Sequence, residues 1–263
     1  MYLEKLRLDG RVAVVTGGGQ GIGAACARAL GEAGATVIIA ELLPERIEAA
    51  LKELKSYGII AYGKQLDVTS SEAVDRVAAE IAAAHGPVSI LVNNAGIAKS
   101  NVKAEDTSDE HWRIHMAINL DAVFWCCRAF GKQMLAAGKG SIVNIGSMSG
   151  YIVNKPQPQS FYNASKAAVH HLTRFLAARL TRERILFNAI APGPYPTWML
   201  STGVGHGGKT DGVDWSSVSQ RNPSGRVGTP QDIAGLAIFL CSRAGEYVVG
   251  QTIASDGGVV AAA

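Results

Sequence analysis

Seven short runs rich in aliphatic and β-branched residues alternate with longer segments of helical periodicity, and this alternation constrains the possible fold most strongly. Each run contains five to eight residues, and the runs lie at 11–16, 35–40, 59–66, 88–93, 140–146, 185–191 and 251–255. Strands separated by ten or more helical residues cannot be hairpins and must be joined by crossovers in a parallel sheet that is covered on both faces. The pattern therefore predicts the α/β class, with a doubly wound parallel sheet.

The length of the chain fits one domain. At 263 residues it is long enough for a large buried core and too short for two enzymatic domains without a visible linker. We therefore expect residues 1–263 to form a single domain. One segment, 197–222, departs from the rhythm, because it has five glycines between positions 203 and 212 and no clear strand or helix pattern. Such an irregular insertion is typical of a functional lid or a mobile loop, and we predict a substrate lid there.

The composition argues against several classes of function. The net charge is only +3, and no basic run provides a footprint for nucleic acid. Nowhere do 18 apolar residues run together, so no membrane span is expected. Cys26, Cys126, Cys127 and Cys241 show no C-x-x-C spacing and lie in apolar helical patterns, which indicates free thiols in a reducing compartment. We expect a cytoplasmic protein.

A glycine-rich turn, "TGGGQGIG" at 16–23, directly follows the first predicted strand. Its spacing G-x-x-x-G-x-G ends at the start of a predicted helix, whose free amides and dipole suit a pyrophosphate. Glycine is needed there because a Cβ would hold the backbone away from the phosphates. Glycines also end strands for purely structural reasons, so the context must support this interpretation. The expected cofactor-binding residues of the turn are Gly17, Gln20, Gly21, Ile22 and Gly23.

Glu41 ends the second predicted strand, 18 positions after Gly23. A carboxylate at this place accepts hydrogen bonds from an adenosine ribose and repels a 2′-phosphate. The alternative is a solvated residue at the end of a strand. No Lys or Arg occurs in "GGGQGIG" or in the two residues after Glu41, so a 2′-phosphate would meet no cation there. The sequence favours NAD over NADP.

The stretch 147–172 contains two tyrosine–lysine pairs with the same spacing of four residues. Lys155 precedes a proline, a position biased away from the helical region, so Tyr151 and Lys155 are expected in a loop. Tyr162 and Lys166 lie in a segment of helical periodicity, where this spacing puts both side chains on one face. A cation near a phenol lowers its pKa from about 10, which makes Tyr162 a candidate general acid/base. The alternative is that the tyrosine packs and the lysine is solvated.

Together these motifs resemble the short-chain dehydrogenase/reductase family over nearly the whole chain, which implies a Rossmann-like dinucleotide-binding and catalytic domain. Tyr162 and Lys166 match the family's active-site tyrosine and lysine. The other matching motifs are Asp67 and Val68 in "LDV", "NNAG" at 93–96, Asn119 in "AINL", Ser147 in "NIGSMSG", "PG" at 192–193 with Thr197, and "DGG" at 256–258. The cofactor-binding residues that the resemblance implies, besides the glycine turn and Glu41, are Asp67, Val68, Asn94, Ala95, Gly96, Tyr162, Lys166, Pro192, Gly193 and Thr197.

The resemblance implies hydride transfer between a nicotinamide and a secondary alcohol or ketone. Tyr162 would exchange a proton with the substrate oxygen, and Ser147 would hydrogen-bond that oxygen. Lys166 would lower the pKa of the tyrosine and hold the ribose, while Asn119 would position a water. No metal is implied, and the six histidines form no recognisable ligand set. We expect His170 and His171 at the surface or at an interface of a homotetramer.

Part of the motif set resembles polyol dehydrogenases and ketose reductases. Ser149, Asn154 and Gln157 have side chains that suit neighbouring hydroxyl groups, although each is equally explained by local bonding to the backbone. The expected substrate-binding residues are Ser147, Ser149, Asn154, Tyr162 and, in the predicted lid, Trp198. Compared with the family, two residues are added between the serine and the tyrosine.

Two other functions remain open. The first is a 3-oxoacyl thioester reductase, which usually uses NADPH and has cations where this chain has Gly18, Gly19 and Glu41. The second is a non-catalytic nucleotide-sensing protein on the same fold. The presence of Asn119 and Ser147 together with the tyrosine–lysine pair argues against the second.

Overall fold

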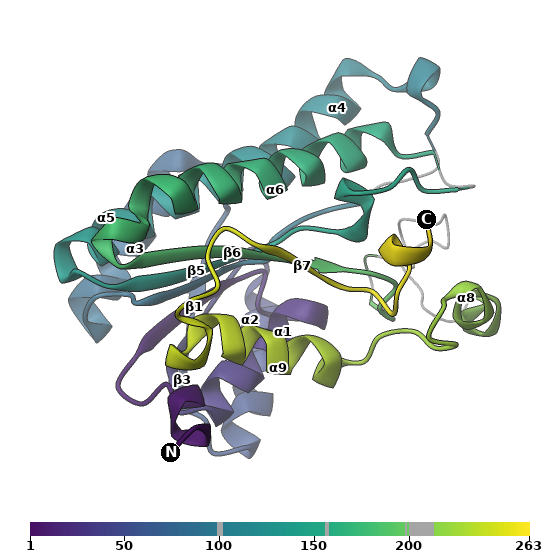
Figure 1. The fold of residues 1–263 in the computed structure, drawn as a ribbon. Helices are drawn as coiled ribbons and strands as arrows, with labels where there is room; N and C mark the ends of the chain where they lie inside the picture. The colour runs from purple at the N-terminus through teal and green to yellow at the C-terminus, as the bar shows by residue number, and fades with distance from the viewer. Residues whose placement is uncertain (99–101, 156–157, 198, 200–212) are drawn as a thin grey trace.

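The computed structural model describes residues 1–98, 102–155, 158–197, 199 and 213–263. Its strands form one parallel sheet in the order β3-β2-β1-β4-β5-β6-β7 (Figure 1). The strands are β1 (Val12–Thr16), β2 (Thr36–Glu41), β3 (Ala61–Gln65), β4 (Ile90–Asn93), β5 (Gly140–Ile145), β6 (Ile185–Pro192) and β7 (Thr252–Ser255). Every predicted run overlaps one of these strands, with β2 and β6 each extending one residue past its run, and every pairing is parallel. The predicted doubly wound sheet is confirmed.

Helices cover both faces of the sheet (Figure 1). One face carries α1 (Gly21–Glu32), α2 (Pro44–Ser56) and α9 (Pro230–Cys241), and the other carries α3 (Ser71–His85), α5 (Ala122–Ala137) and α6 (Ser160–Leu180), with α4 (Asp109–Met116) packed on α6. Side chains alternate along each strand, so Val15 joins the apolar core under α1 and α9 while Val14 joins the core under α3 and α5. The two cores explain why the strands read as nearly continuous apolar runs.

Local signals set the ends of several helices. The Ser70 side chain accepts a hydrogen bond from Ala73 N at the start of α3, and Thr229 with Asp232 forms a capping box at the start of α9. Gly138, with φ of 68°, ends α5 in the left-handed region. The remaining short elements are 3₁₀ turns at Leu3–Leu6, Ala104–Asp106, Met148–Gly150, Thr181–Glu183, Arg243–Gly245 and Val260–Ala262 and a π-helical turn at Ala117–Asp121.

The segment 197–222, in which the sequence shows no clear strand or helix pattern, ends in a short helix. Helix α8 spans Trp215–Arg221, and the carboxylate of Asp214 accepts a hydrogen bond from Ser217 N at 3.1 Å. This cap supplies a hydrogen-bond partner for one of the free amides at the start of the helix. With seven residues, the helix is too short to show a periodic pattern in the sequence. Residues 198 and 200–212 of the predicted lid, with Trp198, lie outside the described residues.

The strand order reverses between β1 and β4, because β2 and β3 extend the sheet on one side and β4 to β7 extend it on the other. The crevice outside the carboxyl ends of such strands is where doubly wound sheets bind ligands. Here the Thr16 hydroxyl at the end of β1 accepts hydrogen bonds from Asn94 N and Ala95 N, at 3.0 and 3.1 Å. These bonds fix the loop after β4 beside the glycine turn. Within the described part of the chain, no helix is both long and apolar enough to cross a membrane.

Candidate active site

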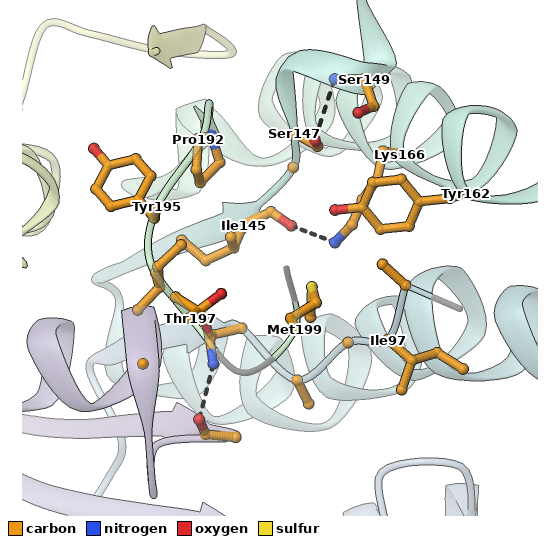
Figure 2. A pocket seen from close by; sticks show the side chains of 18 of the residues that line it. Ile97, Ile145, Ser147, Ser149, Tyr162, Lys166, Pro192, Tyr195, Thr197 and Met199 are labelled. Atoms are coloured by element: carbon orange, nitrogen blue, oxygen red, sulfur yellow. Dashed lines mark hydrogen bonds between the residues drawn. The ribbon is translucent and has the colours of Figure 1, made fainter. Parts of the chain in front are cut away.

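A cavity of about 810 Å³ lies at the carboxyl ends of the central strands. It is lined by the glycine turn, the end of β2, the loops after β3, β4 and β5, helix α6 and the turn after β6, and Figure 2 shows part of this lining. Most of the residues predicted from the sequence meet there, namely Gly17, Gln20, Gly21, Ile22, Glu41, Asp67, Val68, Asn94, Ala95, Gly96, Ser147, Ser149, Asn154, Tyr162, Lys166, Pro192, Gly193 and Thr197. Sequence motifs that lie up to 180 positions apart therefore form one site.

The glycine turn is built for close approach of a ligand to the backbone. Gly17 has φ of 60°, a value that side chains disfavour, and a Cβ on Gly21 would lie 3.4 Å from Thr197 Cγ2 across the cavity. Gly23 has a different role from the predicted cofactor contact. It does not line the cavity, and a Cβ there would overlap the carbonyl oxygen of Gly17 and the Asn94 amide, which donates to that same oxygen at 2.9 Å. Gly23 therefore lets α1 pack against the turn.

Glu41 closes the end of the cavity next to the glycine turn. Its side chain is 7% exposed, and its carboxylate accepts hydrogen bonds from Gly19 N at 3.3 Å and Leu42 N at 3.0 Å. The sequence interpretation missed Arg46, whose Nη1 lies 3.9 Å from Glu41 Oε1 and which lines the same cavity from α2. A cation therefore does lie beside this carboxylate, because the first turn of α2 places Arg46 next to the end of β2. The spacing of five residues was the available signal.

Asn119 lies in the π-helical turn between α4 and α5 and is fully buried. Its Oδ1 accepts a hydrogen bond from Ile97 N, and its Nδ2 donates to Ile97 O, both at 2.9 Å. A π-helical turn inserts an extra residue into a helix and is frequent at functional sites. Through these two bonds Asn119 holds the loop after β4 in place, and it does not line the cavity itself.

Tyr162, Lys166 and Ser147 lie on one side of the pocket, with Thr197 and Met199 across from them (Figure 2). The Nζ of Lys166 donates to Ile145 O at 2.9 Å and lies 5.7 Å from the centre of the Tyr162 ring. Ser147 is extended, and its Oγ accepts a hydrogen bond from Ser149 N at 3.1 Å. The helical spacing of the tyrosine and lysine is confirmed. It places the phenol of Tyr162 and the ammonium of Lys166 beside the carboxyl end of β5.

Burial shifts the pKa values of both Tyr162 and Lys166. It raises the pKa of the Tyr162 phenol, an effect that the neighbouring Ser147 hydroxyl opposes. Burial also lowers the pKa of Lys166 to about 8. The predicted lowering of the tyrosine pKa by the lysine is therefore wrong for the protein alone. Sequence spacing places a cation near a phenol, but it does not report that both groups lose their hydration, which disfavours both charged forms.

The two predicted substrate contacts on the loop after β5 have local hydrogen bonds as well as cavity positions. Ser149 is buried, with its Oγ accepting from Gln159 Nε2 at 3.4 Å, and Asn154 Oδ1 accepts from Asn163 Nδ2 at 3.1 Å. Gln157 lies outside the described residues. Tyr151 is in a loop, as predicted, and its hydroxyl donates to Thr252 O at 2.7 Å.

Sequence reasoning also missed the inward position of His170. Its side chain is 4% exposed within the chain, whereas the neighbouring His171 is exposed, so the surface position expected for both is wrong for His170. The signal was available, because His170 lies four residues after Lys166 and therefore on the same helix face. Gln159 and Arg221, which also line the cavity, carried no signal in the sequence.

In the ranges given above for the structure, no group of three or more His, Cys, Asp or Glu side chains is arranged to hold a metal ion. The four cysteines are free and buried. Burial raises the pKa of the Cys26, Cys126 and Cys241 thiols to about 12 and that of Cys127 still further, so these thiols are unreactive core residues.

Comparisons with known proteins agree with this geometry. A family profile described as enoyl-(acyl carrier protein) reductase matches residues 17–260. The chain is 44% identical over 258 residues to galactitol 2-dehydrogenase of Rhizobium johnstonii, covering 98% of each chain. Crystal structures with similar folds include a short-chain type dehydrogenase/reductase from Mycobacterium marinum (TM-score 0.91, 32% identity, 98% of each chain) and a gluconate 5-dehydrogenase from Burkholderia cenocepacia in complex with NADP and tartrate (TM-score 0.91, 35% identity, 100% of each chain). The chain belongs to the short-chain dehydrogenase/reductase family.

Proposed function

We propose that the protein transfers a hydride between NAD(H) and a secondary alcohol or ketone, most favourably a sugar alcohol and its ketose. The observation that carries this proposal is the convergence of Tyr162, Lys166 and Ser147 in the same cavity as the glycine turn. The nicotinamide supplies a carbon that accepts or donates the hydride. The protein then needs one group to exchange a proton with the substrate oxygen and another to orient it.

Tyr162 is the proton-exchanging group in this proposal. Its raised pKa keeps the phenol protonated, so it can donate to the oxygen of a ketone during reduction. In alcohol oxidation the phenolate must accept the proton, so oxidation should increase with pH. Ser147 hydrogen-bonds the same oxygen, and Lys166 holds the cofactor ribose beside the phenol. Asn119, which we expected to position a water, contributes through the loop at Ile97 that it clamps.

Glu41 supports NAD as the cofactor. The buried carboxylate is held by two backbone amides at the place where a ribose would lie, and a 2′-phosphate there would meet its negative charge. Arg46 opposes this preference, because it offers a cation to the same phosphate, and several structural relatives bind NADP. We propose that NAD is preferred but that NADP is accepted to a measurable extent.

A polyol substrate is supported by the similarity to galactitol 2-dehydrogenase and by the polar lining near Ser147. Ser149, Asn154 and Gln159 line this part of the cavity with groups that suit several hydroxyls. The segment 197–222 is proposed as the substrate lid, since Met199, Val213, Val218 and Arg221 line the cavity from its described parts. The alternative, a 3-oxoacyl thioester reductase, is kept because the chain is also 33% identical over 256 residues to a 3-oxoacyl-(acyl-carrier-protein) reductase of Aquifex aeolicus.

We further propose a cytoplasmic homotetramer. Large apolar side chains are exposed on the outer helical layer, at Trp112 on α4, Phe124 on α5 and Phe175 on α6. On α5, Cys126 and Cys127 belong to the buried core, so the exposed face of this helix is the one that carries Phe124. Light scattering of the purified protein tests the assembly, and a monomer at micromolar concentration would contradict it.

A panel assay tests the proposed activity. The purified chain is mixed with NAD or NADP and with galactitol, other hexitols, pentitols or simple secondary alcohols, and separately with NADH or NADPH and a 3-oxoacyl thioester. The highest kcat/KM for a polyol with NAD supports the proposal, and the highest value for the thioester with NADPH supports the alternative. Nucleotide binding without turnover of any substrate points to a nucleotide-sensing protein.

Two tyrosine variants test the proposed proton donor. Tyr162→Phe should lower kcat by about 10²–10⁴-fold, the usual contribution of general acid–base catalysis, while NADH binding stays close to wild type. Tyr151→Phe is the matched control, because it removes a hydroxyl that is bonded to Thr252 O outside the cavity. An equal loss in both variants would mean that the wrong pair was chosen.

A further inference from the structure

Helix α6 holds the segment that carries Ser147 by two side chains one turn apart. Lys166 Nζ donates to Ile145 O at 2.9 Å, and His170 Nε2 accepts a hydrogen bond from Ser147 N at 3.4 Å. Tyr162, Lys166 and His170 follow each other at intervals of four residues and so share one helix face. The helix therefore presents a proton donor, a cation and a hydrogen-bond acceptor in a row to the end of β5.

The imidazole of His170 is enclosed by the same segment. A Cβ on Gly146 would overlap its ring, and a Cβ on Gly150 would lie 2.5 Å from its Cε1, so only glycine at both positions leaves room for it. The Tyr151 ring packs against the imidazole at a tilt of 44° with centroids 4.7 Å apart, and the Tyr151 hydroxyl donates a hydrogen bond to Thr252 O. The imidazole thus contacts the chain both before and after Ser147.

The hydrogen bond fixes the protonation state of the ring. Because Nε2 accepts from Ser147 N, the proton of a neutral imidazole must lie on Nδ1. Nδ1 is buried and has no hydrogen-bond partner among the described residues. A histidine that only filled space would gain more by turning a nitrogen towards solvent or a carbonyl group. The orphaned Nδ1 indicates that the acceptor at Nε2 is what the position requires.

We propose that His170 is a positioning residue for Ser147: its neutral imidazole holds the Ser147 backbone N–H and thereby aims the serine hydroxyl at the substrate oxygen. The bond from Ser149 N to Ser147 Oγ completes this placement. The inference rests on the proposed function, because it uses the role given there to Ser147. It extends that function to a residue that does not touch the substrate.

The surroundings keep the imidazole neutral. The charged groups that face it are Lys166 and Arg174, both cationic and both on α6, and the titratable Tyr151 packs against it from the loop. Burial and these two cations lower the pKa of His170 to about 4. A protonated ring would present an N–H to the N–H of Ser147, so the acceptor is retained at any pH above this value.

Three variants separate positioning from simple packing. His170→Leu keeps a similar volume without an acceptor, His170→Gln restores a neutral acceptor, and His171→Leu changes the exposed neighbour as a matched control. We expect His170→Leu to lower kcat by about 10²-fold, the cost of a small misplacement of a catalytic group, with KM and NADH affinity near wild type. His170→Gln should recover most of the loss, and His171→Leu should behave as wild type.

Several results would overturn the proposal. Wild-type kcat in His170→Leu would do so, as would equal kcat losses in the Leu and Gln variants when both melt at the wild-type temperature. If His170→Leu does not fold, the Gln variant and the nuclear magnetic resonance spectrum of ¹⁵N-histidine-labelled wild type decide. The proposal requires His170 to carry its proton on Nδ1, and a proton on Nε2 refutes it.

The experiments distinguish failure of the proposed activity from failure of the proposed contact between His170 and Ser147. If wild type turns over no alcohol, ketone or thioester, the activity proposal fails, whereas the His170 tautomer and the Ser147 amide resonance remain measurable. A Ser147 amide shift that changes in His170→Gln and stays constant in His171→Leu supports the contact. An amide shift that is insensitive to His170 rejects it.

Discussion

Lys166 donates a hydrogen bond from its Nζ to the backbone carbonyl oxygen of Ile145, 2.9 Å away, and its side chain is only 3% exposed. The bond joins α6 to the end of β5 and fixes the ammonium 5.7 Å from the centre of the Tyr162 ring. A buried ammonium loses its hydration, so its charge is costly. The same contact that orders the site therefore makes its stability depend on pH.

Lys166→Met should change the pH dependence of unfolding. The pKa of Lys166 is lowered from 10.5 to about 8 in the folded protein. Below pH 8 both states hold the proton, and the folded state carries the full cost of the buried charge. Between pH 8 and 10.5 only the unfolded state holds it, so wild-type stability rises with pH.

The Lys166→Met variant lacks this pH-dependent contribution. Across that pH window, the free energy of unfolding of wild type should therefore rise relative to that of the variant by about 3 kcal/mol, at about 1.4 kcal/mol per pKa unit. Tyr162 is present in both proteins and cancels in the difference. Chemical denaturation at a series of pH values measures it. Lys155→Met, at an exposed lysine on the same cavity, is the control. A constant difference between Lys166→Met and wild type would contradict the buried-charge argument.

Arg46→Ala should strengthen the preference for NAD. Arg46 Nη1 lies 3.9 Å from the Glu41 carboxylate and lines the cavity, so it is the cation that a 2′-phosphate would meet. We expect kcat/KM for NADP to fall several-fold, about 1 kcal/mol for a partly exposed ion pair, with little change for NAD. Glu41→Ser combined with Leu42→Arg should shift the ratio the opposite way.

The matched control for this experiment is Arg28→Ala, since Arg28 lies on α1, pairs with Glu32 and does not line the cavity. Steady-state kinetics with both cofactors gives the ratio directly. A wild type that already prefers NADP would contradict the ribose argument for Glu41, and an unchanged ratio in Arg46→Ala would remove Arg46 from cofactor selection.

Asn119→Ala should destabilise the loop after β4. The variant leaves both the N–H and the carbonyl group of Ile97 without the partners that Asn119 supplies, which costs about 1–3 kcal/mol for buried groups. Asn119→Asp keeps an acceptor for the N–H but places a buried carboxylate oxygen against Ile97 O, so it should lose at least as much stability at neutral pH. Thermal unfolding with and without NADH measures both effects, and equal melting temperatures for wild type and Asn119→Ala would show that the clamp contributes nothing.

Most of the fold was predictable because strands and helices differ in period. Each of the seven strands matches one apolar run to within a residue or two at its ends, and Pro44 and Pro230 begin helices where a missing amide costs nothing. Helix α8 was not predictable, since its seven residues are too few for a periodic pattern. Asn119 was recognised only through the family motif, and the contact that it makes, a clamp on Ile97, depends on two segments 22 residues apart.

The site was predictable where a motif is local. Tyr162 and Lys166 could be paired from their spacing, but the pKa of each depends on burial by distant segments, which no local pattern reports. Arg46 was missed because the sequence argument considered only the two residues after Glu41. The first turn of α2 places the Arg46 cation beside the carboxylate. His170 was missed for another reason: the helix face that it shares with Lys166 extends one turn beyond the tyrosine–lysine pair.

Gly23→Ala and Gly235→Ala should have opposite effects on stability. Gly23 is the last glycine of the turn, and a Cβ there would overlap the Gly17 carbonyl oxygen and the Asn94 amide, neither of which can move without opening the turn. The variant should unfold at a lower temperature and bind NADH weakly. Gly235 lies exposed in α9, and a Cβ added there would have no neighbouring atom within 4 Å, so alanine should add about 0.5–1 kcal/mol of stability through helix propensity. Thermal unfolding and NADH titration of both variants provide the comparison. A Gly23→Ala protein with wild-type NADH affinity would show that the close approach of α1 to the turn is dispensable for cofactor binding.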